Sequence, residues 1–159
     1  MTGDDIGESK LNGEGGNANP PPPARRMTGN GSDAIFPAAM RARLTKDFGF
    51  EAAQTLPAAP EGHKCRRMHG HSFKVEISVE GEVDPARGWL YDHAEISAAM
   101  KPLLARLDHS YLNEIAGLEN PTIEVMAAWF WEKLAPQLPG LCEIVIHETP
   151  TARCIYRGP

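Results

Sequence analysis

The segment at residues 69–81, HGHSFKVEISVEG, alternates between two kinds of side chain and constrains the fold more than any other feature of the sequence. Apolar residues occupy every second position, with polar residues between them: Phe73, Val75, Ile77 and Val79. A period of two predicts a strand with one buried face. His69 and His71 share the parity of the apolar residues, so both are predicted to lie on that face.

Residues 44–54, LTKDFGFEAAQ, predict another strand, because the even positions are apolar except for Lys46. Gln54 stands at the end of the apolar face of this strand. Near the C-terminus, LCEIVIHET and ARCIYR are separated by the dipeptide PT and predict a β-hairpin.

Apolar residues at helical spacing predict two helices between the two pairs of strands. Pro102 lies inside the first helix and predicts a kink or an early break there. Asn120 and Pro121 predict the start of the second, as a cap followed by a proline in the first turn. The predicted fold class is therefore α+β, with the order strand, strand, helix, helix, strand, strand.

Length and composition predict one domain after an N-terminal tail. The 159 residues suffice for one sizeable core. Residues 1–40 are rich in Gly and Pro and have few large apolar residues, so a disordered tail is expected there and a single domain over residues 41–159. The net charge of −5 argues against a general affinity for nucleic acid or anionic membranes. With no signal segment or membrane helix and three cysteines, a soluble cytoplasmic protein is expected.

His69 and His71 are the first candidates for chemistry. Two residues apart on a strand, their imidazoles project from one face, where both ring nitrogens can reach one ion at the ~2.0–2.1 Å that zinc requires. The alternative is a pair of packed core histidines, each of which would need its own hydrogen-bond partner. The metal-binding interpretation is favoured.

Cys65 precedes these histidines in a loop, and its basic neighbours favour the thiolate form. It is a candidate nucleophile or base, with a fourth zinc ligand or an inert thiol as the alternatives. Asp108 and His109, in LDHSYLN at the predicted end of a helix, form a carboxylate–imidazole pair suited to proton transfer. A solvated helix terminus explains that pair equally well.

Glu148 places a carboxylate at the end of an apolar strand face, with the parity of Ile144 and Ile146. A buried carboxylate needs partners. A planar ligand with two N–H donors is one, and an ion pair with a neighbouring arginine is the alternative.

The chain resembles the 6-pyruvoyl-tetrahydropterin synthase family, and within it most closely the bacterial 6-carboxytetrahydropterin synthase branch of the queuosine pathway. The resemblance spans residues 48–158 and is carried by FEAAQTLP, EGHKCRRMHGHSF, GEVDPARGWLYDHAEI, LDHSYLN, GLENPTIEV and ETPTARCIYRG. The combination of C-x-x-x-H-G-H, L-D-H-x-x-L-N and E-N-P-T is specific. The segments CIYRG and EGHKC favour the carboxy-forming branch over the pyruvoyl one.

The resemblance implies a tunnelling fold, in which an antiparallel sheet carries two helices on one face and the subunits of a homo-oligomer share active sites at their interfaces. It implies a zinc-dependent lyase that converts 7,8-dihydroneopterin triphosphate to 6-carboxy-5,6,7,8-tetrahydropterin, acetaldehyde and triphosphate. Carried over to this sequence, the zinc ligands are His69 and His71, the catalytic residues are Cys65, Asp108 and His109, and the residue that binds the pterin is Glu148.

The sequence departs from the family pattern at Gln54, where the family has a third zinc-binding histidine. An amide oxygen is a weaker zinc donor than imidazole. Three explanations are open: Gln54 ligates weakly or through water, His93 swings in as a replacement ligand, or the chain has lost the lyase activity. In the last case it would be a pterin-binding pseudoenzyme or catalyse another pterin side-chain reaction, such as that of a 6-pyruvoyl-type synthase. A cupin oxygenase is disfavoured, because the two helices do not suit that fold.

Overall fold

The computed structural model describes residues 40–159. The predicted disordered tail lies outside these residues, apart from Met40. Within the described part of the chain, no helix combines the length and the apolar character that crossing a membrane would require. Its strands and α-helices are, in chain order, β1 Arg41–Gln54, β2 His69–Glu82, α1 His93–Leu107, β3 Ser110–Tyr111, α2 Ile123–Leu134, β4 Leu141–Thr149 and β5 Ala152–Tyr156.

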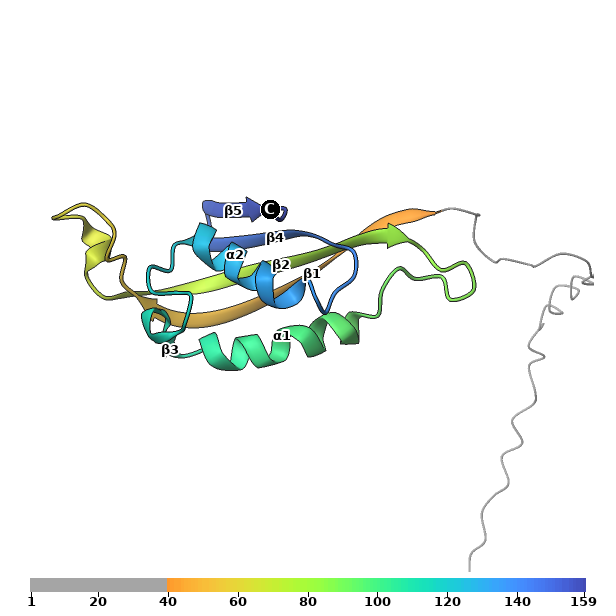
Figure 1. Cartoon of the computed structure of the whole chain (residues 1–159), viewed down its shortest axis with the longest axis horizontal. Coiled ribbons are helices and arrows are strands. Elements are labelled where there is room, and N and C mark those ends of the chain that lie inside the picture. The colour runs from red at the N-terminus through yellow and green to blue at the C-terminus, as the bar shows by residue number, and fades with distance from the viewer. Residues whose placement is uncertain (1–39) are drawn as a thin grey trace, which may run out of the picture. The chain divides into compact units, whose positions relative to one another are not determined.

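The strands form one five-stranded sheet in the order β3-β1-β2-β4-β5 (Figure 1). The neighbours β1–β2, β2–β4 and β4–β5 are antiparallel. The predicted α+β class and the order of strands and helices are confirmed, with one addition: β3 pairs in parallel with β1, which makes the sheet mixed. A strand of two residues is too short to show a periodic pattern, so β3 was not predicted.

The β1–β2 hairpin sets the geometry of the site. Its 14 residue pairs run without a shift from Arg41 opposite Glu82 to Gln54 opposite His69, and His71 stands opposite Ala52. Because side chains alternate between the faces of a sheet, this register places Gln54, His69 and His71 on the same face as the buried Phe50 and Phe73. The strand parity predicted from the sequence is confirmed.

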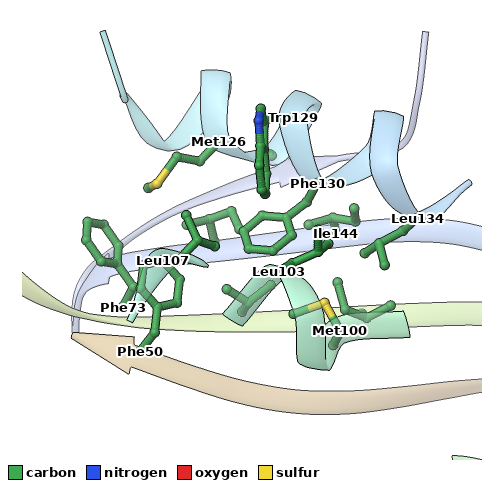
Figure 2. Packing of buried hydrophobic residues seen from close by; sticks show 14 of the residues in the cluster. Phe50, Phe73, Met100, Leu103, Leu107, Met126, Trp129, Phe130, Leu134 and Ile144 are labelled. Atoms are coloured by element: carbon green, nitrogen blue, oxygen red, sulfur yellow. The ribbon is translucent and has the colours of Figure 1, made fainter. Parts of the chain in front are cut away.

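Both helices contribute to a single apolar core on that face of the sheet. Phe130 and Leu134 of α2 join Met100, Leu103 and Leu107 of α1 over the strands (Figure 2). Phe130 is fully buried and lies 6.5 Å from the ring of Phe50, which stacks on Phe73 at 5.0 Å. This core fixes the position of the sheet end that carries His69 and His71.

The helix boundaries differ from the prediction in two places. Helix α1 continues through Pro102 to Leu107, so the predicted early break is wrong. The packing of Leu103 and Leu107 outweighs the roughly 3 kcal/mol that an internal proline costs. Helix α2 begins at Ile123 with Thr122 as its cap, whose hydroxyl accepts from the Val125 N–H at 3.3 Å.

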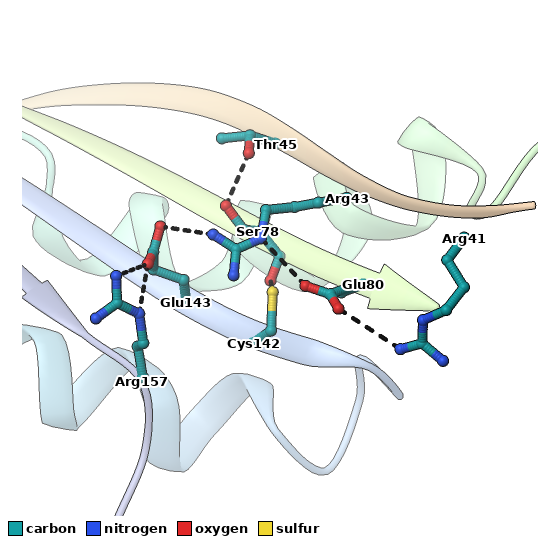
Figure 3. Close-up of polar contacts among 8 residues, drawn as sticks. All are labelled: Arg41, Arg43, Thr45, Ser78, Glu80, Cys142, Glu143 and Arg157. Atoms are coloured by element: carbon teal, nitrogen blue, oxygen red, sulfur yellow. Dashed lines mark hydrogen bonds and ion pairs between the residues drawn. The ribbon is translucent and has the colours of Figure 1, made fainter. Parts of the chain in front are cut away.

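The helix-free face of the sheet carries a polar cluster far along the strands from the histidines (Figure 3). Glu143 is paired there with Arg43 at 3.2 Å and with Arg157 at 2.8 Å, which ties β1, β4 and the segment after β5 together. Cys142 lies beside this cluster, and partial burial raises the pKa of its thiol. A thiol of this kind is typical of a structural cysteine.

Candidate functional site

The site is built at the sheet end where β1 stops and β2 starts. Gln54 is completely buried there, and its Nε2 donates to Glu148 Oε1 of β4 at 2.9 Å. An ionised carboxylate only accepts hydrogen bonds, so the amide nitrogen faces Glu148 and the amide oxygen faces away. That oxygen, Gln54 Oε1, is buried and finds no hydrogen-bond partner in the described part of the chain.

His69, directly opposite Gln54, also has a buried nitrogen without a partner. Its Nδ1 lies 2.7 Å from the carbonyl oxygen of Arg67. The carbonyl accepts, so Nδ1 carries the proton and Nε2 keeps its lone pair. Among residues 40–159, nothing donates to this buried Nε2. A backbone carbonyl that orients the ring through its other nitrogen is the usual arrangement behind a metal-bound histidine.

A ligand atom from each of His69, His71 and Glu148 lies within 4.8 Å of the other two, close enough to hold one metal ion. His71 Nε2 is 3.4 Å from Glu148 Oε1, and the two imidazole rings meet at right angles with centroids 5.1 Å apart. Zinc and other first-row divalent cations accept two imidazoles and a carboxylate as ligands. His69 Nε2, a buried nitrogen without a partner in the described residues, is an atom that such an ion would satisfy, so these residues fit a metal.

Cys65 lies beside this group, in the single-turn 3₁₀ helix Lys64–Arg66. It lines a pocket of about 520 Å³ together with His69, His71 and Glu148. Two hydrogen bonds hold this loop. The backbone N–H of Leu56 donates to the carbonyl oxygen of Cys65 at 2.8 Å, and the backbone N–H of Cys65 donates to His63 Nδ1 at 3.2 Å. The structure thus brings four of the sequence-predicted site residues into one pocket.

Asp108 and His109 lie elsewhere. Asp108 caps the C-terminus of α1, and its Oδ1 is 3.0 Å from His109 Nδ1. His109 is 79% exposed at its side chain and adopts φ 56°. The Glu51 N–H donates to Asp108 Oδ1 at 2.9 Å; this bond and that from His109 hold the pKa of Asp108 below its ordinary value.

His109 lines a second pocket, of about 450 Å³, together with residues of β1 and β2 such as Glu51 and Ser72. Of the residues around the Cys65 pocket, His71 alone also lines this one. One copy of the chain therefore does not place Asp108 and His109 in the pocket of Cys65.

Glu51 is a site residue that the sequence did not reveal. Its backbone binds both members of the Asp108–His109 pair, because its carbonyl also accepts from His109 N at 2.6 Å. Its carboxylate accepts from the Ser72 hydroxyl at 2.8 Å in the same pocket. The alternation of β1 placed Glu51 on the polar face. Its contacts with Asp108 and His109 form next to the short parallel pairing of β1 with β3, which the sequence did not predict.

His93 does not replace the missing histidine within one chain. It is the first residue of α1, and its carbonyl accepts from Lys46 Nζ at 3.2 Å. Lys46 precedes Gln54 by eight residues on β1, a separation of roughly 26 Å along an extended strand. The replacement-ligand hypothesis is therefore wrong for a single copy of the chain.

Comparisons with known proteins agree on one family. Residues 43–159 match the model of the family described as 6-pyruvoyl tetrahydropterin synthase. The 6-carboxy-5,6,7,8-tetrahydropterin synthase of Synechocystis sp. is 42% identical over 122 residues, which cover 73% of this chain and 93% of that protein. The dihydroneopterin monophosphate aldolase of Pyrococcus furiosus is 33% identical over 101 residues, 64% of this chain and 82% of the relative. Among solved structures, Caenorhabditis elegans 6-pyruvoyl tetrahydropterin synthase superposes with a TM-score of 0.70 at 26% identity, over 76% of this chain and 98% of that one.

Proposed function

The chain belongs to the 6-pyruvoyl tetrahydropterin synthase family, and on this premise we propose that it is a zinc-dependent lyase of the carboxy-forming kind. Its substrates are 7,8-dihydroneopterin triphosphate and water, and its products are 6-carboxy-5,6,7,8-tetrahydropterin, acetaldehyde and triphosphate. The observation that carries the proposal is the pocket where Cys65 meets the His69, His71 and Glu148 group, in a chain 42% identical to a 6-carboxytetrahydropterin synthase.

In the proposed reaction His69 and His71 hold the Zn²⁺, with Gln54 at the position of the third ligand. When bound, the metal supplies Lewis acidity that makes the substrate C–H beside its side-chain oxygens acidic. Cys65 removes that proton as a thiolate from the wall of the same pocket. Its loop, held by His63 and Leu56, keeps the sulfur in position.

Glu148 binds the pterin in this proposal. Its contacts to Gln54 and His71 both use Oε1. Its second oxygen, Oε2, can then accept from the 2-amino and ring N–H edge of the substrate, since each carboxylate oxygen offers two acceptor sites.

Asp108 and His109 act as the proton relay from a second copy of the chain. Asp108 accepts from His109 Nδ1 and orients the ring, and the exposed ring is free to reach a neighbouring subunit. The separation of the His109 pocket from that of Cys65 supports a homo-oligomer whose active sites combine residues of two subunits.

Product analysis tests the proposed function. Purified protein incubated with 7,8-dihydroneopterin triphosphate should release acetaldehyde and form the 6-carboxy product, and Cys65→Ala should abolish both. Cys142→Ala is the matched control, because its thiol lies by the distant polar cluster and the variant should keep its activity. A 6-pyruvoyl product would assign the chain to the other branch, and ligand binding without turnover would make it a pseudoenzyme.

A further inference from the structure

We propose that Glu148 takes the place of the missing third imidazole, so that the metal in this chain is held by His69, His71 and a carboxylate. This inference rests on the metal dependence of the proposed function, concerns the same site, and assigns Glu148 to the metal instead of to the 2-amino edge of the pterin. It also gives Gln54 a specific role, in which the amide nitrogen holds Glu148 at the ion.

The geometry around Gln54 carries the inference. The side chain is fully buried, and its only hydrogen bond to the described residues is the one from Nε2 to Glu148 Oε1, at 2.9 Å. A histidine at this position would direct a ring nitrogen at the ion and offer a different contact to Glu148. With glutamine there, the amide hydrogen bond holds the Glu148 carboxylate beside the two histidines. One ligand atom from each of the three residues then lies within 4.8 Å of the other two.

The electrostatics of Glu148 point the same way. Within residues 40–159 the Glu148 carboxylate lies 3.4 Å from His71 Nε2, which is charged only when protonated, and no arginine or lysine pairs with it. Gln54 Oε1 and His69 Nε2, both buried acceptors, lack donors in the same region. A buried acceptor without a donor is costly, and a divalent ion held by this group would supply the positive charge that His69 Nε2 and the Glu148 carboxylate lack.

The ligand set defines the class of cation. Two neutral imidazoles with one carboxylate select first-row divalent metals such as Zn²⁺, Fe²⁺, Co²⁺ or Mn²⁺. Mg²⁺ and Ca²⁺ prefer sites made of oxygen ligands, so they should bind poorly here. The single negative charge in the set offsets half of the charge of the ion, which a set of three histidines does not do.

A double-mutant cycle tests the assignment with metal affinity as its readout. Zn²⁺ affinity is measured by titration calorimetry for the full chain, Glu148→Gln, Gln54→His and the double variant Gln54→His/Glu148→Gln. Glu80→Gln is the matched control, because Glu80 lies in the distant polar cluster. Circular dichroism and thermal unfolding confirm that each variant is folded.

Glu148→Gln should weaken Zn²⁺ binding at least about tenfold, since even the loss of a residue that only orients a metal ligand typically costs about 10–100-fold. With His at position 54 a third imidazole is present, so the same Glu148 change should have little effect. Unchanged affinity in Glu148→Gln, or an equal loss in both backgrounds, overturns the assignment. Metal binding that depends on Glu148, without acetaldehyde release, would support this inference and contradict the proposed function. Acetaldehyde release with metal binding that does not depend on Glu148 would support the proposed function and contradict this inference.

Discussion

The backbone N–H of Glu51 donates to the Asp108 carboxylate at 2.9 Å, which joins the C-terminal part of β1 to the end of α1. Because a bond to the ionised form favours that form, it keeps the pKa of Asp108 low. This contact fixes where the Asp108–His109 pair stands and makes it sensitive to acid.

The low pKa of Asp108 predicts a loss of stability in acid. A carboxyl whose pKa is lower in the folded than in the unfolded state stabilises the fold above its unfolded pKa, and this contribution disappears as the pH falls through the folded pKa. The free energy of unfolding should therefore drop as the pH falls below about 4, the ordinary pKa of an aspartate. Asp108→Asn should show a shallower drop in denaturant titrations. An identical slope in wild type and variant would count against the Glu51–Asp108 bond.

The separation of the two pockets predicts complementation between inactive variants. Cys65→Ala and His109→Ala should each abolish acetaldehyde release when purified alone. Mixed oligomers obtained by co-expression should recover activity, since some sites then combine an intact Cys65 pocket with an intact Asp108–His109 pair.

The control for complementation is the mixture of Cys65→Ala with Glu148→Ala. These two residues line one pocket of one chain, so each site in the mixed oligomer still lacks one of them. Two results would contradict an active site shared between subunits. One is recovery of activity in this control, and the other is no recovery when Cys65→Ala is combined with His109→Ala.

Gly140 should tolerate no side chain. It has φ +84°, and a Cβ atom built on it would lie 2.7 Å from the carbonyl oxygen of Glu80. Gly62 has a similar φ of +81° with nothing within 4 Å, so it serves as a control. Gly62→Ala should cost about 1–2 kcal/mol from the left-handed backbone alone, and Gly140→Ala clearly more. Equal free energies of unfolding would show that the contact with Glu80 relaxes freely.

Local patterns predicted the parts of the site that depend on strand parity. The alternation of β1 and β2 placed Gln54, His69 and His71 on the apolar face, and the hairpin register confirms this. Parity also put Glu148 at the end of an apolar face, where it now lies beside the histidines. These positions follow from the two-residue period of a strand, which the sequence shows directly.

Long-range contacts could not be predicted from local sequence patterns. The hydrogen bond between Gln54 and Glu148 joins residues 94 positions apart, and the bond from Glu51 to Asp108 depends on the two-residue strand β3. Propensity also failed at Pro102, since tertiary packing of α1 overrides the local cost of the proline. Sequence reasoning therefore located the candidate site residues and missed the contacts that hold them.

Removal and return of the metal tests the central claim most directly. The purified protein should contain close to one first-row divalent ion per chain, and chelation should abolish acetaldehyde release from 7,8-dihydroneopterin triphosphate. One equivalent of Zn²⁺ should restore the activity, whereas Mg²⁺ should not. Full turnover by the chelated, metal-free protein would contradict a metal-dependent lyase built on His69, His71 and Glu148.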